Sequence, residues 1–302
     1  TATGDLSVAE TTSLEYNPID TGKPKDASDV LKYLAGDGGL KDGFLSTGAF
    51  ANAKTNTDDP DAKTLSIAAS INIIDVTAET VARIGGITDR TITQSATTIS
   101  ANSIDVAANS ILETANMAGN VGDFINFDEK LKEGWAKIQG KQQKFSNPLI
   151  NPIPANGSTG VGITYMGTSY DNTTTAQIGD NVTLTASGGD VGVTANASTL
   201  DIVIGASGAA SSGDAQEFGA LGVIQYNHIQ SQTLAAIGNG SAITLSNADS
   251  DLTVSALDDN DIWNFVGAVV KASNVAIGAS VGVNDLDIDT QAKIDGASSI
   301  TS

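Results

Sequence analysis

Residues 275–302 read VAIGASVGVNDLDIDTQAKIDGASSITS: a long run of apolar and small residues, an Ala-x-Ile step, a turn and a short Ile-Thr strand pattern. The step Ala292-Lys293-Ile294 recurs upstream, each time with Gly, Asn or Asp soon after it. The earlier copies are Ala82-Arg83-Ile84, Ala176-Gln177-Ile178 and Ala235-Ala236-Ile237. The last two intervals between copies are nearly equal, and the first is longer. This spacing indicates a regular repeat, one unit of which carries an insertion.

A second recurring segment supports the same repeat. Residues 251–256, DLTVSA, are matched by residues 190–195, 103–108 and 5–10. Apolar and polar residues alternate in these segments with the period of two that is typical of β-strands. The chain opens and closes within such units, so we expect a piece of a longer repeat array whose end strands pair with further modules or copies.

Composition and charge narrow the class of protein. The 302 residues include 32 Gly, 5% aromatic residues and no Cys, which predicts an aliphatic core and excludes disulfides and thiolate metal sites. With 15 Lys and Arg against 35 Asp and Glu, the net charge is −20, which argues against nucleic acid and anionic lipid as partners. No apolar run approaches the roughly 18 residues of a membrane-spanning helix, and residues 1–8, TATGDLSV, lack the basic and apolar regions expected of a secretion signal.

Two stretches break the strand pattern and predict helix-containing insertions. In the first, residues 26–34 resemble a short capped helix. In the second, apolar residues recur every three or four positions, and three prolines follow. The expected organisation is residues 1–13, the end of a β-solenoid repeat; 14–46, a helix-containing insertion; 47–118, β-solenoid; 119–157, an amphipathic helical insertion with a Pro-rich exit; and 158–302, β-solenoid repeats.

The predicted fold class is all-β, a parallel β-helix (β-solenoid) with the two helix-containing insertions; a meandering antiparallel sandwich is the alternative. Each unit contains about six strand-like runs of five to ten residues, which predicts two or three coils per unit. Runs of small residues, such as 204–210 and 278–282, favour a narrow interior. The expected turns are residues 179–181, 187–190, 238–240, 258–261 and 295–296.

The repeats resemble the large leukotoxin-type and filamentous-haemagglutinin-like adhesins of Gram-negative bacteria. The resemblance rests on residues 275–284 leading into 289–294, and on 219–227 leading into 233–238. In that family, Gly- and Ala-rich apolar runs end near Val-x-Val-Asn and pass into Thr-x-Ala-x-Ile-Gly. It covers about two thirds of the chain, leaves out both insertions, and implies a secreted or surface-held β-solenoid stalk without catalytic residues.

Three carboxylates form a candidate cation site. Asp285, Asp287 and Asp289 alternate with apolar residues, so on a strand they share one face at steps of about 6.6 Å. One interpretation is Ca²⁺ held between coils, because calcium prefers several oxygen ligands. The other is a solvated edge that discourages the addition of further strands. Apart from this possible Ca²⁺, no cofactor is expected.

Catalysis is not expected, and no catalytic residue is assigned. The best alternative from another class is a β-helix polysaccharide lyase or hydrolase, which needs paired carboxylates or a base beside a cation. After residue 150 the only Lys and Arg residues are Lys271 and Lys293, against fifteen Asp and Glu. That part of the chain therefore offers little of the required chemistry.

The second insertion supplies the candidate interaction residues. Its predicted helix carries apolar side chains on one face and lysines beside them: Phe124, Phe127, Leu131 and Trp135, with Lys130 and Lys137. The helix either docks on the flank of the solenoid or recognises another protein. We therefore expect an extracellular structural and adhesive segment whose partners are neighbouring repeats, copies of itself, or a receptor or glycan on a host or bacterial surface.

Overall fold

The computed structural model describes residues 6–13, 45–50, 65–86, 97–120, 159–210, 218–271, 275–296 and 298–302. All its regular elements are strands, and no helix occurs among these residues. The strands are β1 (Leu6–Ser13), β2 (Leu45–Phe50), β3 (Leu65–Ile84), β4 (Thr97–Ala101), β5 (Ile104–Asn120), β6 (Thr159–Ile178), β7 (Val182–Ala186), β8 (Val191–Ala210), β9 (Phe218–Ile237), β10 (Ala242–Leu245), β11 (Leu252–Lys271), β12 (Val275–Ile294) and β13 (Ser299–Thr301).

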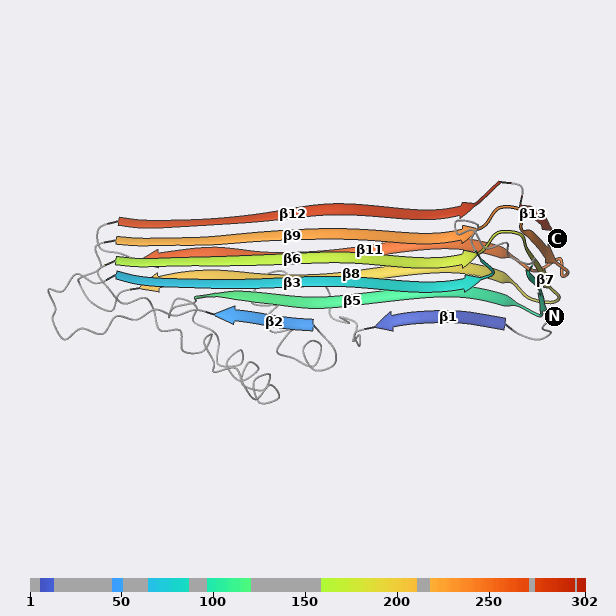
Figure 1. The fold of residues 1–302 in the computed structure, drawn as a ribbon, viewed down its shortest axis with the longest axis horizontal. Coiled ribbons are helices and arrows are strands. Elements are labelled where there is room, and N and C mark those ends of the chain that lie inside the picture. Colours follow the sequence, from blue (N-terminus) through green and yellow to red (C-terminus); the bar gives the residue numbers. More distant parts are fainter. Residues whose placement is uncertain are drawn as a thin grey trace, which may run out of the picture.

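Three parallel sheets form from these strands (Figure 1). Strands β3, β6, β9 and β12 form the front sheet; β5, β8 and β11, with β1 and β2 beside β5, form the back sheet; the short strands β4, β7, β10 and β13 form the end sheet. The chain runs along a front strand, through a short end strand and back along a back strand. Long strands of the front and back sheets therefore point in opposite directions, and the end sheet lies at one end of both.

The register of the sheets reproduces the repeat read from the sequence. Ile84, Ile178, Ile237 and Ile294 are stacked partners in the front sheet. In the back sheet, residues 6–10, 104–108, 191–195 and 252–256 align in the same way, since Leu6 pairs with Ile104, Ile104 with Val191 and Leu252 with Val191. All-β architecture with parallel sheets is thus confirmed, and it is the arrangement that a β-solenoid requires.

The arrangement of the repeat unit differs from the prediction. One complete unit supplies one strand to each of the three sheets, and its long strands reach 20 residues and are not the short runs expected. Residues 258–261, expected to form a turn, lie inside β11. Asp258 Oδ2 there accepts hydrogen bonds from Ser231 Oγ at 2.7 Å and Thr233 Oγ1 at 3.1 Å. Polar residues that resemble a turn in sequence can thus continue a strand when the facing sheet satisfies them. The other four predicted turns are confirmed.

An apolar core fills the space beside the end sheet. Ile178 and Ile237 from the front sheet, Val193 from the back sheet, and Leu184 and Ile243 from the end sheet are at most 1% exposed. Farther along the strands the interior narrows. A Cβ at Gly205 would lie 2.1 Å from Met166 Cε, so Gly205 faces the interior against Met166, which would have to shift to admit a larger residue. The small-residue runs thus place at least some of their members inside.

Both predicted insertions fall mainly on residues outside the described ones, so their helices stay predictions. Their flanking strands are described. β1 ends opposite Ile111 of β5 and β2 begins opposite Thr114. The chain between β1 and β2 therefore departs from the middle of one row of the back sheet. β5 continues to Asn120 and β6 begins at Thr159, so the second insertion connects the back sheet to the front sheet.

Candidate functional site: the front sheet and its turns

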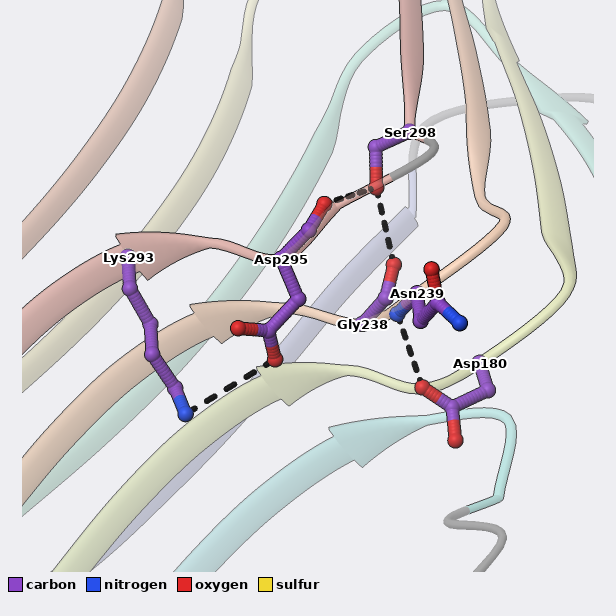
Figure 2. A network of polar contacts seen from close by, with 6 residues as sticks. All are labelled: Asp180, Gly238, Asn239, Lys293, Asp295 and Ser298. Carbon is purple, nitrogen blue, oxygen red and sulfur yellow. Dashed lines mark hydrogen bonds and ion pairs between the residues drawn. The ribbon is translucent and has the colours of Figure 1, made fainter.

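Turns of successive coils bind one another at the end of the front sheet (Figure 2). Asp180 Oδ1 accepts a hydrogen bond from the Asn239 amide at 2.8 Å. Ser298 Oγ lies 3.0 Å from the Gly238 carbonyl and 2.9 Å from that of Asp295. Lys293 Nζ lies 3.7 Å from Asp295 Oδ2. These side chains join each turn to the turn of the preceding coil or brace it within its own.

Glycines allow the turns to approach closely. A Cβ at Gly179 would lie 2.1 Å from the Gly86 carbonyl oxygen, and one at Gly238 would lie 2.6 Å from the Gly179 carbonyl carbon. In each case the obstructing atom belongs to the backbone of the adjacent turn, which cannot rotate away. The repeated Ile-Gly of the sequence therefore reflects contact between stacked turns.

The outward surface of the front sheet divides into two halves along the strands. The acidic half-face consists of the outward residues of 75–83, 169–177, 228–236 and 285–293. It has six carboxylates against two basic side chains: Asp75, Glu79, Asp171, Asp285, Asp287 and Asp289, with Arg83 and Lys293. This half lies toward the end sheet, over the apolar core.

The three aspartates of the predicted calcium site lie on this acidic half-face, all exposed. Asp285 Oδ2 accepts a hydrogen bond from Tyr226 Oη at 3.2 Å and lies 3.1 Å from His228 Nδ1. The bond to Asp285 raises the pKa of Tyr226. Asp289 accepts both of its hydrogen bonds from Gln291 Nε2, at 2.9 Å. Within the described ranges, no group of three or more His, Asp or Glu is placed to hold a metal ion.

The other half of the same surface is apolar. We define the apolar half-face as the outward residues of 65–73, 159–167, 218–226 and 275–283, none of which is charged. Eleven of the sixteen large apolar side chains exposed among the described residues belong to it. Ile71 is 65% exposed, Ile163 52% and Val281 54%. A contiguous exposed patch of this kind marks an interaction surface in a soluble protein.

Sequence reasoning missed this surface. In 65–74, LSIAASINII, large apolar residues alternate with Ser70 and Asn72, and the usual expectation places the apolar set inside. Here Ser70 is 5% and Asn72 8% exposed, whereas Ile71 and Ile73 face outward. The available signal was the small or polar residue that recurs at most alternate positions of the copies, although Met166, Leu221 and Val223 depart from it.

Asparagines connect the two sheets behind the apolar half-face. Asn72 Nδ2 donates to Asn116 Oδ1 at 2.7 Å, and Asn116 Nδ2 donates to Thr168 Oγ1 at 3.1 Å. Asn227 Nδ2 of β9 likewise donates to Asn264 Oδ1 of β11 at 3.0 Å. These bonds satisfy polar groups that would otherwise make burial costly.

A buried carboxylate marks the transition between the two kinds of interior. Asp201 Oδ1 accepts hydrogen bonds from Thr114 Oγ1 at 2.8 Å and Tyr170 Oη at 3.0 Å. Burial raises the pKa of Asp201 to about 6, although these two bonds oppose part of the rise. Burial and the nearby Asp201 charge raise the pKa of Tyr170 far above its ordinary value. Asp201 is 0% and Tyr170 1% exposed, so the network has no open path for a substrate.

The predicted interaction residues of the second insertion, Phe124, Phe127, Leu131 and Trp135 with Lys130 and Lys137, lie outside the described residues. Their role stays a prediction.

Comparison with protein families, with curated proteins and with solved structures found no match for this chain. The described residues contain no helix with the length and apolarity needed to cross a membrane. The repeat geometry and the two half-faces are therefore the basis for a functional proposal.

Proposed function

We propose that the chain is a structural and adhesive segment of a large extracellular surface or filament protein, and that its three sheets close into a β-solenoid. It acts as a rigid display surface that associates with neighbouring modules or subunits. The observation that carries this proposal is the stacking of long strands in one register through all four rows of the front sheet.

The dimensions favour display over reach. A 20-residue strand such as β9 extends for about 66 Å, whereas each added coil lengthens the stack by only about 4.8 Å. Each of these short increments in the length of the stack therefore requires a whole repeat unit. A chain built only to span distance would use shorter coils, so we infer that the broad sheet faces are the working part.

Rigidity comes from the stacking. Each inner long strand is paired along its length on both sides, and the turns are joined coil to coil by contacts such as Asp180 with Asn239. Repeats of this type stabilise one another through their nearest neighbours. The buried Tyr170 and Asp201 belong to the interior hydrogen-bond network in this proposal and perform no catalysis.

Surface display on a bacterial cell tests the proposal. The chain would be fused to an outer-membrane carrier, and both clumping of cells and their retention on a solid support under flow would be measured. We expect clumping, retention or both to rise above the level of the carrier alone. A folded, displayed chain that changes neither would contradict the proposed function.

A further inference from the structure

We propose that the apolar half-face pairs with the apolar half-face of a second copy, with the strands of the two copies antiparallel. This inference rests on the proposed function, because it names the surface through which copies associate. It concerns the outward residues of 65–73, 159–167, 218–226 and 275–283.

The size of the apolar half-face suits a specific contact. Nine residues along a strand cover about 30 Å, and four strands cover about 19 Å, or roughly 570 Å² on each copy. Two copies would then bury about 1,100 Å², which passes the roughly 1,000 Å² expected of a biological interface. Sheet faces pack about 10 Å apart, and outward Ile and Val side chains suit such packing.

Small residues flatten the centre of the half-face. Four outward residues form one row across the strands. Ile163 lies between Ala69 and Gly222 in this row, and Ala279 of β12 is the next neighbour of Gly222. A Cβ at Gly222 would have no atom within 4 Å. The central row therefore has a single large side chain, Ile163, with a shallow opening over Gly222 beside it, which another sheet can approach.

Charge selects the antiparallel arrangement. If the strands of the two copies ran in the same direction, each acidic half-face would lie over the other, and six carboxylates would oppose six. Such like-charge contacts disfavour association. Rotation about an axis across the strands keeps the apolar half-faces in contact and carries the acidic half-faces to opposite sides. This arrangement is isologous and closes as a dimer.

A second copy fits this surface better than a lipid bilayer. The apolar half-face continues without a step into the acidic half-face, and the chain carries a net charge of −20. Anionic headgroups would meet that acidic surface when the apolar half-face inserted. A second copy avoids the conflict by reversing its strands.

The principal test uses Gly222→Glu, which places a carboxylate in the middle of the apolar half-face. Gly296→Glu is the matched control, because an added Cβ there also meets nothing within 4 Å and the position lies in the turn after β12. Sedimentation velocity should show a concentration-dependent dimer for wild type and Gly296→Glu. For Gly222→Glu we expect the dissociation constant of the dimer to rise at least 100-fold, with an unchanged circular dichroism spectrum.

A second variant tests the same surface independently, in case Gly222→Glu does not fold. The double substitution Ile163→Thr with Ile224→Thr keeps β-branched residues at positions 52% and 49% exposed, and should also dissociate the dimer. A wild type that stays monomeric at every concentration would overturn the inference. A dimer unaffected by either variant would assign association to another surface, such as a strand edge, and would overturn it as well.

The arrangement is tested separately with spin labels, since the chain contains no Cys. Labels at Gly222→Cys in the two copies should lie within about 20 Å of one another, because sheet faces pack about 10 Å apart. Labels at Gln232→Cys, farther along β9 in the acidic half-face, should lie about 66 Å apart, which is twice the length of the strand between the two positions. Short distances at both positions would show parallel strands and overturn the inference.

Two further measurements separate the alternatives. Flotation with neutral phosphatidylcholine and with anionic vesicles is expected to leave the protein unbound; binding that Gly222→Glu abolishes, without any dimer, would favour lipid as the occupant. On displaying cells, Gly222→Glu should reduce clumping and spare retention on the support. Retention by a monomeric wild type would refute this contact while leaving the proposed function standing.

Discussion

The two halves of the long front strands differ in where they place their apolar and polar side chains. Beside the end sheet the interior is apolar, with Ile178 and Leu184 fully buried, and the front surface is acidic. Farther from the end sheet the interior combines the hydrogen-bonded Asn72, Asn116 and Thr168 with a small apolar cluster that includes Met166 and Val223, and the front surface is apolar. The outward surface of the front strands thus changes from acidic to apolar near the level of Tyr170 and Asp201.

This difference gives the two halves separate roles: one half stabilises the fold, and the other presents a surface for association. In the half beside the end sheet, three sheets enclose apolar side chains, and the hydrophobic effect stabilises the fold there. In the other half, hydrogen-bonded Asn and Thr side chains share the interior with a small apolar cluster around Met166, and most of the large apolar side chains of β3 and β12 remain available outside. Substitutions in the two halves should therefore have different consequences.

The largest expected effect compares two isoleucines of β6. Ile178 is 0% exposed in the apolar core and Ile163 is 52% exposed on the apolar half-face. We expect Ile178→Ala to reduce the free energy of unfolding by about 3 kcal/mol, because it leaves a cavity. Ile163→Ala should cost less than about 1 kcal/mol. Chemical denaturation of monomeric protein measures both; equal losses would contradict the division into two halves.

A pH-dependent effect is expected at the transition between the halves. The Asp201 carboxyl has a pKa of about 6 when folded and an ordinary value of 3.8, so the folded chain binds more protons between those values. Stability from this group is full below about pH 4 and is lost as pH rises through about 6. Asp201→Asn should therefore be on the order of 2 kcal/mol more stable than wild type at pH 8 and similar to it at pH 4.

Melting temperatures of the two proteins across this range provide the measurement. The difference between them is informative, because burial also raises the pKa of Glu113 to about 7 and adds a change of the same sign to both. A difference that is the same at pH 4 and pH 8 would show that Asp201 does not titrate in this way.

A smaller loss is expected in the polar interior. Asn116 is 0% exposed and bonds to Asn72 and Thr168, so Asn116→Ala removes both of these buried hydrogen bonds and should cost about 1–2 kcal/mol. Asn196→Ala is the matched control on the outer surface, where its amide donates to Asn109 Oδ1 at 2.8 Å. That change should cost about 0.5 kcal/mol. Denaturation midpoints that rank the two variants in the opposite order would refute the structural role of the asparagines.

Periodicity predicted the repeat well because stacking in one register demands it. Isoleucines 84, 178, 237 and 294 align as expected, and so do the glycines of the turns, since the backbone of each turn contacts the next. These are local requirements repeated in every coil. They leave a signal in a single sequence.

The side of each strand that faces the interior could not be predicted in the same way. Alternation shows that Ile71 and Asn72 lie on opposite sides, but it does not show which side is inside. That choice depends on Asn116 of the back sheet, 44 residues away, which accepts the Asn72 hydrogen bond. Residues 258–261 were misread for a related reason, because Ser231 and Thr233 of another strand satisfy Asp258.

The smallest expected effect concerns calcium on the acidic half-face. Alternate residues of a strand are about 6.6 Å apart, whereas oxygens that share one Ca²⁺ lie about 2.3–2.6 Å from it and hence within about 5 Å of one another. Asp285 also has Tyr226 and His228 as partners, and Asp289 has Gln291. We expect about 1 mM Ca²⁺ to change the melting temperature by less than about 1 °C, since a ligand stabilises only when it exceeds its dissociation constant. A rise of several degrees that a chelator reverses and Asp287→Asn abolishes would instead show that flexible carboxylates converge on the ion, and the acidic half-face would then be a calcium site as well as a source of repulsion.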